Sequence, residues 1–241
     1  MTGAASGLAR AVALKLAALG ADLCIVDLNA AALDATANDA RSLGCAVEPV
    51  ATDLARPENC ILAVDRAIAR FGRLDALCNI AGVLSFSPFT QVTAAQLHTT
   101  LAVNFSAPFF LSQAAIPHLL ATNGAIVNVA SAAAFIGEAY LAAYAASKAA
   151  LVSLTKSLAM EYAKTSLRVS AVAPGGMETG MGAEIGGFKG DLDVGLIQRY
   201  SGLRGRVSVD DVAEMIALLA SEQSGAFHGG CVHMDAGISA G

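Results

Sequence analysis

Thr2-Gly3-Ala4-Ala5-Ser6-Gly7-Leu8-Ala9 is the stretch that decides the fold, because it leads directly into an apolar-periodic segment, Arg10 to Leu19, that ends at Gly20. Small residues at such a turn let the backbone bend tightly and approach a pyrophosphate at the N-terminus of the following helix. A flexible loop explains a glycine-rich turn about as well, so the residues around it must decide.

A carboxylate follows the next strand candidate. Residues 21–26 of this candidate are followed by Asp27, which lies twenty residues after Gly7. At this position a carboxylate can bind the ribose hydroxyls of NAD, and it would repel the 2′-phosphate of NADP. No Lys or Arg lies between Asp27 and Asn38 to attract that phosphate. The sequence therefore favours NAD, with an ordinary strand-end carboxylate as the alternative interpretation.

Strand and helix patterns alternate along the whole chain of 241 residues. This rhythm predicts an α/β fold, a doubly wound, Rossmann-like parallel sheet with helices on both faces, in one domain spanning 1–241. The strand candidates are 21–27, 47–52, 74–79, 125–131, 167–173 and 231–235, and the helix candidates are 8–19, 30–43, 58–71, 94–121, 141–164 and 209–221.

Tyr144 and Lys148 stand four residues apart, thirteen and seventeen residues after Ser131. If the stretch is helical, the side chains of Tyr144 and Lys148 lie on the same face of the helix. An ammonium beside a phenol favours the phenolate, so we expect Lys148 to lower the pKa of Tyr144. Ser131 follows the apolar run 125–129 and would lie at the carboxyl edge of the sheet, where open α/β folds bind ligands. The set predicts a proton-transfer site. The alternative interpretation is a helix with a tyrosine in the core and a solvated lysine.

Taken in order, these motifs resemble the single-domain short-chain dehydrogenase/reductase family over essentially the whole chain. The resemblance implies that Asn104, Ser131, Tyr144 and Lys148 form the catalytic set, with Asn104 holding a water that links Lys148 to solvent. It also implies a group of cofactor contacts with no metal: Gly3, Ser6, Gly7, Leu8, Asp27, Asp53, Leu54, Asn79, Ala81, Gly82, Tyr144, Lys148, Pro174, Gly175, Met177 and Thr179.

Three departures from the family pattern stand out. Family members carry a strand immediately before the Thr-Gly turn, and here only Met1 precedes Thr2. That strand is central in a 3-2-1-4-5-6 order. We therefore expect that the sequence begins after this strand, and the alternative is a sheet without its middle strand. Ala9 replaces the third glycine, which is tolerated at that packing position. Ile80 replaces the second asparagine of the motif that begins at Asn79, and Asn79 is expected to keep its structural hydrogen bonds.

Net charge and cysteine usage indicate which classes of partner and which compartment the protein fits. The net charge is −5 and no Lys or Arg cluster is present, which argues against nucleic acid or an anionic membrane as partner. The five cysteines are odd in number and scattered, which favours buried thiols in a reducing cytoplasm over disulfides or metal ligands. No signal peptide is visible at the start.

One long stretch is free of charge. Residues 76–137 contain no Asp, Glu, Lys or Arg, yet prolines and polar residues interrupt them, so a membrane span is not expected. The helix predicted at 94–121 then lacks a charged outer face, and the helix at 141–164 is nearly as apolar. We expect both to pack against a second copy in a homotetramer or homodimer, a grouping that the family resemblance also implies.

The segment 180–206 is rich in glycine with apolar residues between, which fits a substrate lid or a surface loop. Small or apolar residues follow Ser131 and Gly175, and they indicate an apolar alcohol or ketone. Glu138 would contradict this if it faced the pocket. The sequence thus predicts NAD-dependent hydride transfer between a secondary alcohol and a ketone. The alternatives are an NADPH-dependent 3-oxoacyl-carrier-protein reductase and a non-catalytic nucleotide-binding scaffold or sensor.

Overall fold

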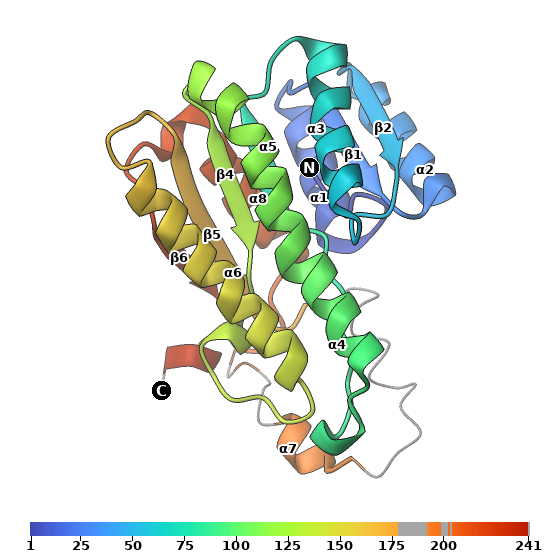
Figure 1. The fold of residues 1–241 in the computed structure, drawn as a ribbon, viewed down its shortest axis with the longest axis vertical. Coiled ribbons are helices and arrows are strands. Elements are labelled where there is room, and N and C mark those ends of the chain that lie inside the picture. Colours follow the sequence, from blue (N-terminus) through green and yellow to red (C-terminus); the bar gives the residue numbers. More distant parts are fainter. Residues whose placement is uncertain (178–191, 199–201, 203, 241) are drawn as a thin grey trace.

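The computed structural model describes residues 1–177, 192–198, 202 and 204–240, and in them strands alternate with helices as expected (Figure 1). The strands are β1 (Leu23–Asp27), β2 (Val47–Ala51), β3 (Ala76–Asn79), β4 (Ala125–Val129), β5 (Arg168–Pro174) and β6 (Cys231–Met234). The helices are α1 (Gly7–Ala18), α2 (Ala30–Ser42), α3 (Pro57–Phe71), α4 (Ala94–Leu101), α5 (Ala107–Ala121), α6 (Ala142–Glu161), α7 (Val194–Gln198) and α8 (Val209–Ala220). The α/β prediction is confirmed, with boundaries that shift by at most three residues.

Local sequence signals account for several of these boundaries. Helix α2 begins after Asn29, whose side chain accepts a hydrogen bond from the N–H of Ala32 at 3.1 Å. Helix α3 has Pro57 in its first turn and ends at Gly72, which adopts the left-handed conformation at φ 72°. Helix α4 begins with a capping box between Thr93 and Gln96.

All strand pairs are parallel, in the orders β1-β2 and β3-β4-β5-β6. Thr2 lies between the two groups: it pairs with Val26 of β1, and its N–H donates to the carbonyl of Cys78 in β3 at 3.1 Å. The combined order is β2-β1-Thr2-β3-β4-β5-β6. Met1 and Thr2 therefore lie at the centre of the sheet, where the carbonyl of Met1 accepts a hydrogen bond from the N–H of Val26 at 3.0 Å.

The Thr2 side chain strengthens this narrow connection. Its hydroxyl oxygen accepts hydrogen bonds from the N–H groups of Ile80 and Ala81, both at 3.0 Å, and the residue is 2 % exposed. Buried N–H groups without partners cost free energy, so this hydroxyl fixes the turn that follows β3.

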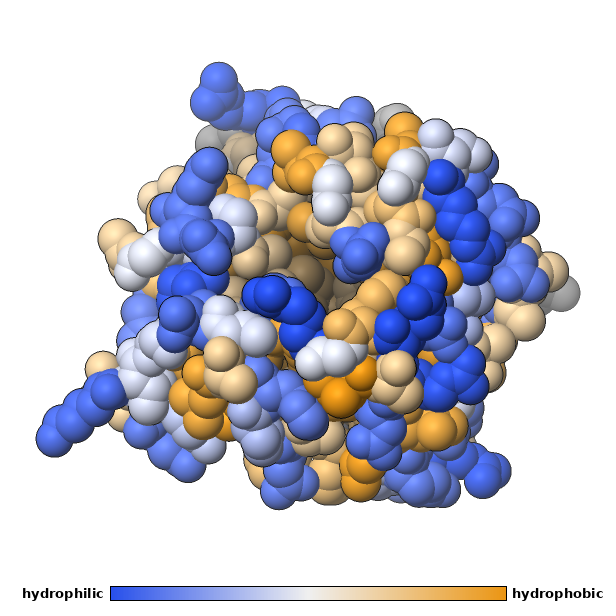
Figure 2. All heavy atoms as spheres, turned by 90° about the horizontal axis from the view of Figure 1, so that it is seen from above, coloured by the Kyte–Doolittle hydropathy of each residue, from blue (hydrophilic) through white to orange (hydrophobic). Residues whose placement is uncertain are grey.

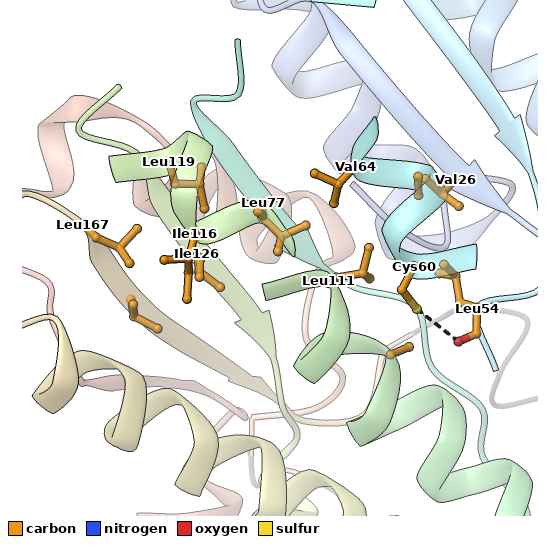
Figure 3. Packing of buried hydrophobic residues seen from close by; sticks show 14 of the residues in the cluster. Val26, Leu54, Cys60, Val64, Leu77, Leu111, Ile116, Leu119, Ile126 and Leu167 are labelled. Atoms are coloured by element: carbon orange, nitrogen blue, oxygen red, sulfur yellow. Dashed lines mark hydrogen bonds between the residues drawn. The ribbon is translucent and has the colours of Figure 1, made fainter. Parts of the chain in front are cut away.

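The helices cover the sheet on both faces (Figure 1). Helices α1, α2 and α8 pack on one face, where α1 and α8 share a hydrophobic cluster with β3 and β4. Helices α3, α5 and α6 pack on the other. There, Val64 of α3 and Leu111 and Ile116 of α5 meet Leu77 and Ile126 of the sheet (Figure 3). Burying such side chains stabilises a fold by about 1.5–3 kcal/mol each.

The segment expected as one helix at 94–121 is interrupted. Residues Ala102–Ser106 form a π-helical turn between α4 and α5. Such turns are rare and often mark functional positions, because the extra residue redirects the side chains on one face. Asn104 is the central residue of this turn and is fully buried.

A chain of buried amides crosses the sheet. Asn79 donates from Nδ2 to Oδ1 of Asn128 at 2.8 Å, and Asn128 donates to the hydroxyl of Thr155 on α6 at 2.9 Å. Asn79 and Asn128 are also register partners in β3 and β4. This chain ties the two strands to the helix that covers them.

Figure 2 looks down on the end of the molecule at which β4 begins, and a hollow bordered by both hydrophilic and hydrophobic residues opens near its middle. The arrow of β4 in Figure 1 points away from that end, so the carboxyl edge of the sheet lies at the other. No helix among the described residues is both long enough and apolar enough to cross a bilayer.

Candidate active site

A cleft of about 830 Å³ runs along the carboxyl ends of the strands. Parallel α/β sheets bind ligands in this position because the loops that follow the strands diverge there. It is lined by Gly3, Ser6, Gly7, Leu8, Ala9, Asp27, Leu28, Thr52, Asp53, Leu54, Ile80, Ala81, Gly82, Val83, Leu84, Phe86, Val103, Val129, Ala130, Ser131, Ala132, Glu138, Leu141, Tyr144, Lys148, Pro174, Gly175, Gly176, Met177, Ile197, Gly202, Gly205, Arg206 and Ile238.

The glycine-rich turn forms one wall of this cleft. Gly3 has φ 79°, and a Cβ at Gly3 would lie 2.9 Å from the Cα of Ala81, so the position requires glycine. Ser6 precedes α1 in an extended conformation, and its side chain makes no capping hydrogen bond to the helix. The first N–H groups of α1 therefore lie at the cleft without a side-chain cap, an arrangement suited to an anion.

Two carboxylates stand beside this turn. Asp27 accepts hydrogen bonds from the backbone N–H of Ala5 at 3.0 Å and of Asn29 at 2.9 Å, one on each oxygen. Asp53 accepts from the N–H of Ala55 at 2.9 Å, and Leu54 beside it is 8 % exposed. Both carboxylates line the cleft and retain further lone pairs for a ligand.

Ser131 and Tyr144 meet on the next part of the wall. Burial raises the pKa of Tyr144 to about 12, and a side-chain hydrogen bond with Ser131 offsets only part of this rise. The charge of Glu138 raises it further. Ser131 also accepts from the N–H of Ala133 at 3.2 Å, which caps the 3₁₀ turn Ala132–Ala134 and fixes the serine in place.

Lys148 is 3 % exposed, one turn of α6 after Tyr144. Its Nζ donates to the carbonyl oxygen of Val129 at 2.7 Å and lies 5.9 Å from the centre of the Tyr144 ring. Burial lowers the pKa of Lys148 to about 8. The expected lowering of the Tyr144 pKa is not found, because burial of the phenol dominates and burial of Lys148 disfavours the ammonium that would favour the phenolate.

Asn104 supports the site from behind the cleft wall. Its Oδ1 accepts from the N–H of Val83 at 2.8 Å, and its Nδ2 donates to the carbonyl of Val83 at 2.9 Å and to the hydroxyl of Ser147 at 3.0 Å. A Cβ on Gly82 would lie 3.3 Å from Oδ1 of Asn104 and 3.5 Å from Nζ of Lys148. Asn104 therefore lies next to Lys148 but does not line the cleft.

Asn79 differs from its expected role as a cofactor contact. It is 2 % exposed, it does not line the cleft, and its amide is engaged with Asn128. Asn79 is the last residue of β3 and directly precedes the turn to Ala81 and Gly82. Those two residues do line the cleft.

The far wall follows β5. A Cβ on Gly175 would lie 2.9 Å from the backbone of Asp235, so only glycine fits between Pro174 and the exit of β6. Met177 pairs with Val207. Thr179 lies outside the described residues, as does most of the expected lid, of which α7 is described and contributes Ile197 to the cleft.

Sequence reasoning did not assign several cleft residues. Leu84 and Phe86 follow the Asn79–Gly82 turn, and together with Leu141 they pack against Tyr144. Ile238 comes from the C-terminal turn Ile238–Ala240. They carry no motif of their own, and only the position of their loops after strand ends could have indicated them. Glu138, whose direction the sequence left open, does line the cleft.

Comparison with known proteins agrees with this geometry. A family model described as enoyl-(acyl carrier protein) reductase matches residues 3–239. A 3-oxoacyl-(acyl-carrier-protein) reductase of Thermotoga maritima is 30 % identical over 99 % of this chain and 96 % of its own. A D-threitol dehydrogenase of Mycolicibacterium smegmatis is 35 % identical over 99 % of this chain and 91 % of its own.

Two solved structures share the fold with bound cofactors. A short chain dehydrogenase of Mycobacterium paratuberculosis bound to NAD has a TM-score of 0.93 at 25 % identity and covers 100 % of this chain and 97 % of its own. One from Burkholderia cenocepacia J2315 in complex with NADP has a TM-score of 0.88 at 32 % identity and covers 99 % and 96 %. The cleft, its Ser-Tyr-Lys wall and these similarities over the full chain together place the protein in the short-chain dehydrogenase/reductase family, as an NAD(P)-dependent oxidoreductase.

Proposed function

We propose that this protein interconverts a secondary alcohol and a ketone with NAD as its cofactor. The observation that carries the proposal is the meeting of Ser131, Tyr144 and Lys148 on one wall of a cleft whose other wall is a glycine-rich helix start. The nicotinamide supplies the hydride chemistry when it is bound. The protein supplies placement, proton exchange and the exclusion of water.

Tyr144 exchanges the proton with the substrate oxygen. With a pKa of about 12 its hydroxyl is protonated near neutral pH, so it is set to donate to a carbonyl oxygen, which is the reduction direction. Ser131 donates a hydrogen bond to the same oxygen and orients it. Oxidation needs the phenolate, which the ammonium form of Lys148 favours by its charge.

Asn104 and Lys148 complete the set. Asn104 forms hydrogen bonds with Val83 and Ser147 next to Lys148. We assign it the role of holding a water through which Lys148 exchanges protons with solvent. Lys148 also binds the nicotinamide ribose of the cofactor. Its pKa of about 8 lets it gain and lose a proton near physiological pH.

The preference for NAD rests on Asp27. Its carboxylate lines the cleft beside Ser6 and Leu28, and it would repel a 2′-phosphate. The cofactor contacts proposed for this half of the cleft are Gly3, Ser6, Gly7, Leu8, Asp27, Asp53, Leu54, Ala81 and Gly82, and Pro174, Gly175 and Met177 join Tyr144 and Lys148 in the other half.

A second candidate is an NADPH-dependent 3-oxoacyl-carrier-protein reductase. The observation in its favour is the full-length similarity to the Thermotoga maritima enzyme of that name. Asp27 argues against NADPH, and the net charge of −5 argues against an acidic carrier protein as partner.

We also propose a homotetramer or homodimer. Large apolar side chains are exposed on α4, α5 and α6, where Leu97 is 42 %, Phe109 40 % and Met160 77 % exposed. Exposed apolar side chains on helices that carry few charges fit association with a second copy. Sedimentation should show an oligomer at micromolar concentration, and a monomer there would contradict this part of the proposal.

The site of action proposed is the cytoplasm. All five cysteines are free, and burial raises the pKa of the thiols, to about 11 for Cys60 and Cys231. Free, unreactive thiols suit a reducing compartment.

Parallel calorimetric titrations with NADH and NADPH, followed by turnover assays on secondary alcohols and 3-oxoacyl thioesters, test the function. Tighter binding of NADH together with alcohol oxidation supports the proposal. Tighter binding of NADPH with thioester reduction supports the second candidate instead. Nucleotide binding without turnover of either class would indicate a non-catalytic scaffold or sensor.

A further inference from the structure

The loop 132–141, between Ser131 and α6, is held at both ends. At its start, Ala132–Ala134 forms the turn capped by Ser131, and the ring of Phe135 lies 4.3 Å from that of His233. At its end, the carbonyl of Tyr140 accepts from the N–H of Ser87 at 3.0 Å. The conformation of the loop is therefore set by the fold.

Tyr140 is the most constrained residue of this loop. It has φ 66°, a left-handed conformation that costs a non-glycine residue free energy. Its hydroxyl accepts from the N–H of Asp193, just before α7, at 3.0 Å. Strain that is retained this way indicates that the position of the loop matters, and Glu138 lies two residues before Tyr140.

Glu138 faces the cleft together with Tyr144. It is half-buried, and its charge acts on the phenol of Tyr144, so the two groups are close. Its backbone carbonyl accepts from the N–H of Leu141 at 3.4 Å, but within the described residues no group donates to its carboxyl oxygens. Burial without a donor raises the pKa of Glu138 to about 7.

The described residues beside Tyr144 in this part of the cleft are largely apolar. Leu84, Phe86 and Leu141 form the wall against Tyr144, and Ile197 reaches the cleft from α7. A partly buried carboxyl without donors is costly unless a ligand supplies one. Among the described residues, this part of the cleft thus presents an apolar wall, the reacting hydroxyls and the carboxyl of Glu138.

We propose that Glu138 determines specificity by accepting a hydrogen bond from a second hydroxyl of the substrate, next to the carbon that is oxidised. The substrate class is then small diols and hydroxyketones with an apolar face. This inference rests on the proposed function, and it replaces the simple apolar alcohol that the neighbouring residues alone indicated.

Other ligand groups fit less well. A carboxylate or phosphate beside Glu138 would be repelled by its charge. An ammonium would be repelled by the cation of Lys148, which lines the cleft near Tyr144. A hydroxyl is neutral and can donate to the carboxylate or accept from the carboxylic acid.

Matched pairs of probes test this inference: cyclohexanol against cyclohexane-1,2-diol, and butan-2-ol against butane-2,3-diol. The ratio of kcat/KM for diol over mono-alcohol is measured in the wild type, in Glu138→Leu and in Glu138→Gln. Hydrogen bonds to charged groups are strong, so Glu138→Leu should lower the ratio by about tenfold or more, with Glu138→Gln intermediate. The matched control is Glu161→Leu, at the exposed end of α6, which should leave the ratio unchanged.

Calorimetric binding of the diols, with and without NADH, gives a readout apart from turnover. Diol binding that Glu138→Leu weakens, without turnover, would support the role of Glu138 and contradict the oxidoreductase reaction on this class. Turnover of mono-alcohols at a ratio that Glu138→Leu leaves unchanged would overturn the role of Glu138 and leave the proposed function standing. Neither binding nor turnover would contradict both. Preference for 2-aminocyclohexanol over the diol would also overturn the assignment of a hydroxyl.

Discussion

Asp27 and Glu138 line the same cleft, yet their surroundings are opposite. Both oxygens of Asp27 accept hydrogen bonds from backbone N–H groups close in the chain, those of Ala5 and Asn29. The carboxyl of Glu138 has no donor in the described part of the chain. A carboxylate whose bonds come from the turn around it belongs to a prepared frame. One that lacks them depends on what binds next to it.

The comparison extends to the two halves of the cleft. The half around Asp27 is built from tight turns and backbone groups, as at Gly3 and the start of α1. The half around Glu138 is built from side chains on longer loops, which include Phe86 and Ile238. Four variants separate the contributions of the two halves.

Tyr144→Phe should have the largest effect. Loss of the proton-exchanging hydroxyl should lower kcat by about 10²–10⁴-fold, while NADH affinity changes little, because the frame around Asp27 is intact. Steady-state kinetics and NADH titration measure the two quantities. Tyr162→Phe, just after α6 and outside the cleft, is the matched control. Full turnover in Tyr144→Phe would refute the catalytic assignment.

Asp27→Ala should act on the other half. We expect NADH binding to weaken by about 10–100-fold, since hydrogen bonds to a charged group are lost, and NADPH to lose less. Titration with both nucleotides measures the change, and the exposed Asp34→Ala on α2 serves as control. If NADH and NADPH weakened equally, Asp27 would not be the selector.

Thr2→Val tests the connection between the halves. It leaves the N–H groups of Ile80 and Ala81 without their acceptor, which should lower the free energy of unfolding by about 2 kcal/mol. Denaturant unfolding gives the value, with the exposed Thr99→Val as reference. An unchanged stability would show that water replaces the hydroxyl at the centre of the sheet.

Glu138→Gln should show the smallest effect, and only in one pH range. Because the pKa of Glu138 rises from 4.5 to about 7 on folding, the native state binds more protons in this window, and stability falls as pH rises through it. The variant should match the wild type below the window and exceed it by about 1 kcal/mol above it, after allowance for partial solvent exposure. Unfolding at several pH values, with Glu161→Gln as control, measures this. A constant difference at all pH values would contradict the assignment.

Much of the fold was predictable from the sequence. The strands alternate regularly with helices, and Asp27, Ser131 and Pro174 come at or just after the ends of their strands, so the carboxyl edge could be located. The connection through Met1 and Thr2 could not, because a single bridged residue has no periodic pattern. The π turn at Asn104 was also missed, since an extra residue in a helix leaves an apolar pattern continuous.

The candidate site divides in the same way. Glycine at position 3 and the Tyr-x-x-x-Lys spacing are local features, which sequence shows directly. The pKa of Tyr144 depends on how deeply the phenol is buried by Leu84, Phe86 and Leu141, residues from separate loops. Burial is a property of the assembled fold, so its dominance over Lys148 could be found only in the structure.

The amide pair Asn79–Asn128 has a consequence for how accurately the chain folds. Strand β4 is buried at all five positions, so its hydrophobic pattern does not distinguish one pairing register from the next. A slip by one residue would set each amide opposite an aliphatic or sulfur-containing neighbour and leave two buried polar groups unpaired. Sheets with a shifted register are thereby destabilised relative to the native one, so the two asparagines favour the correct pairing of β3 with β4 as the sheet forms.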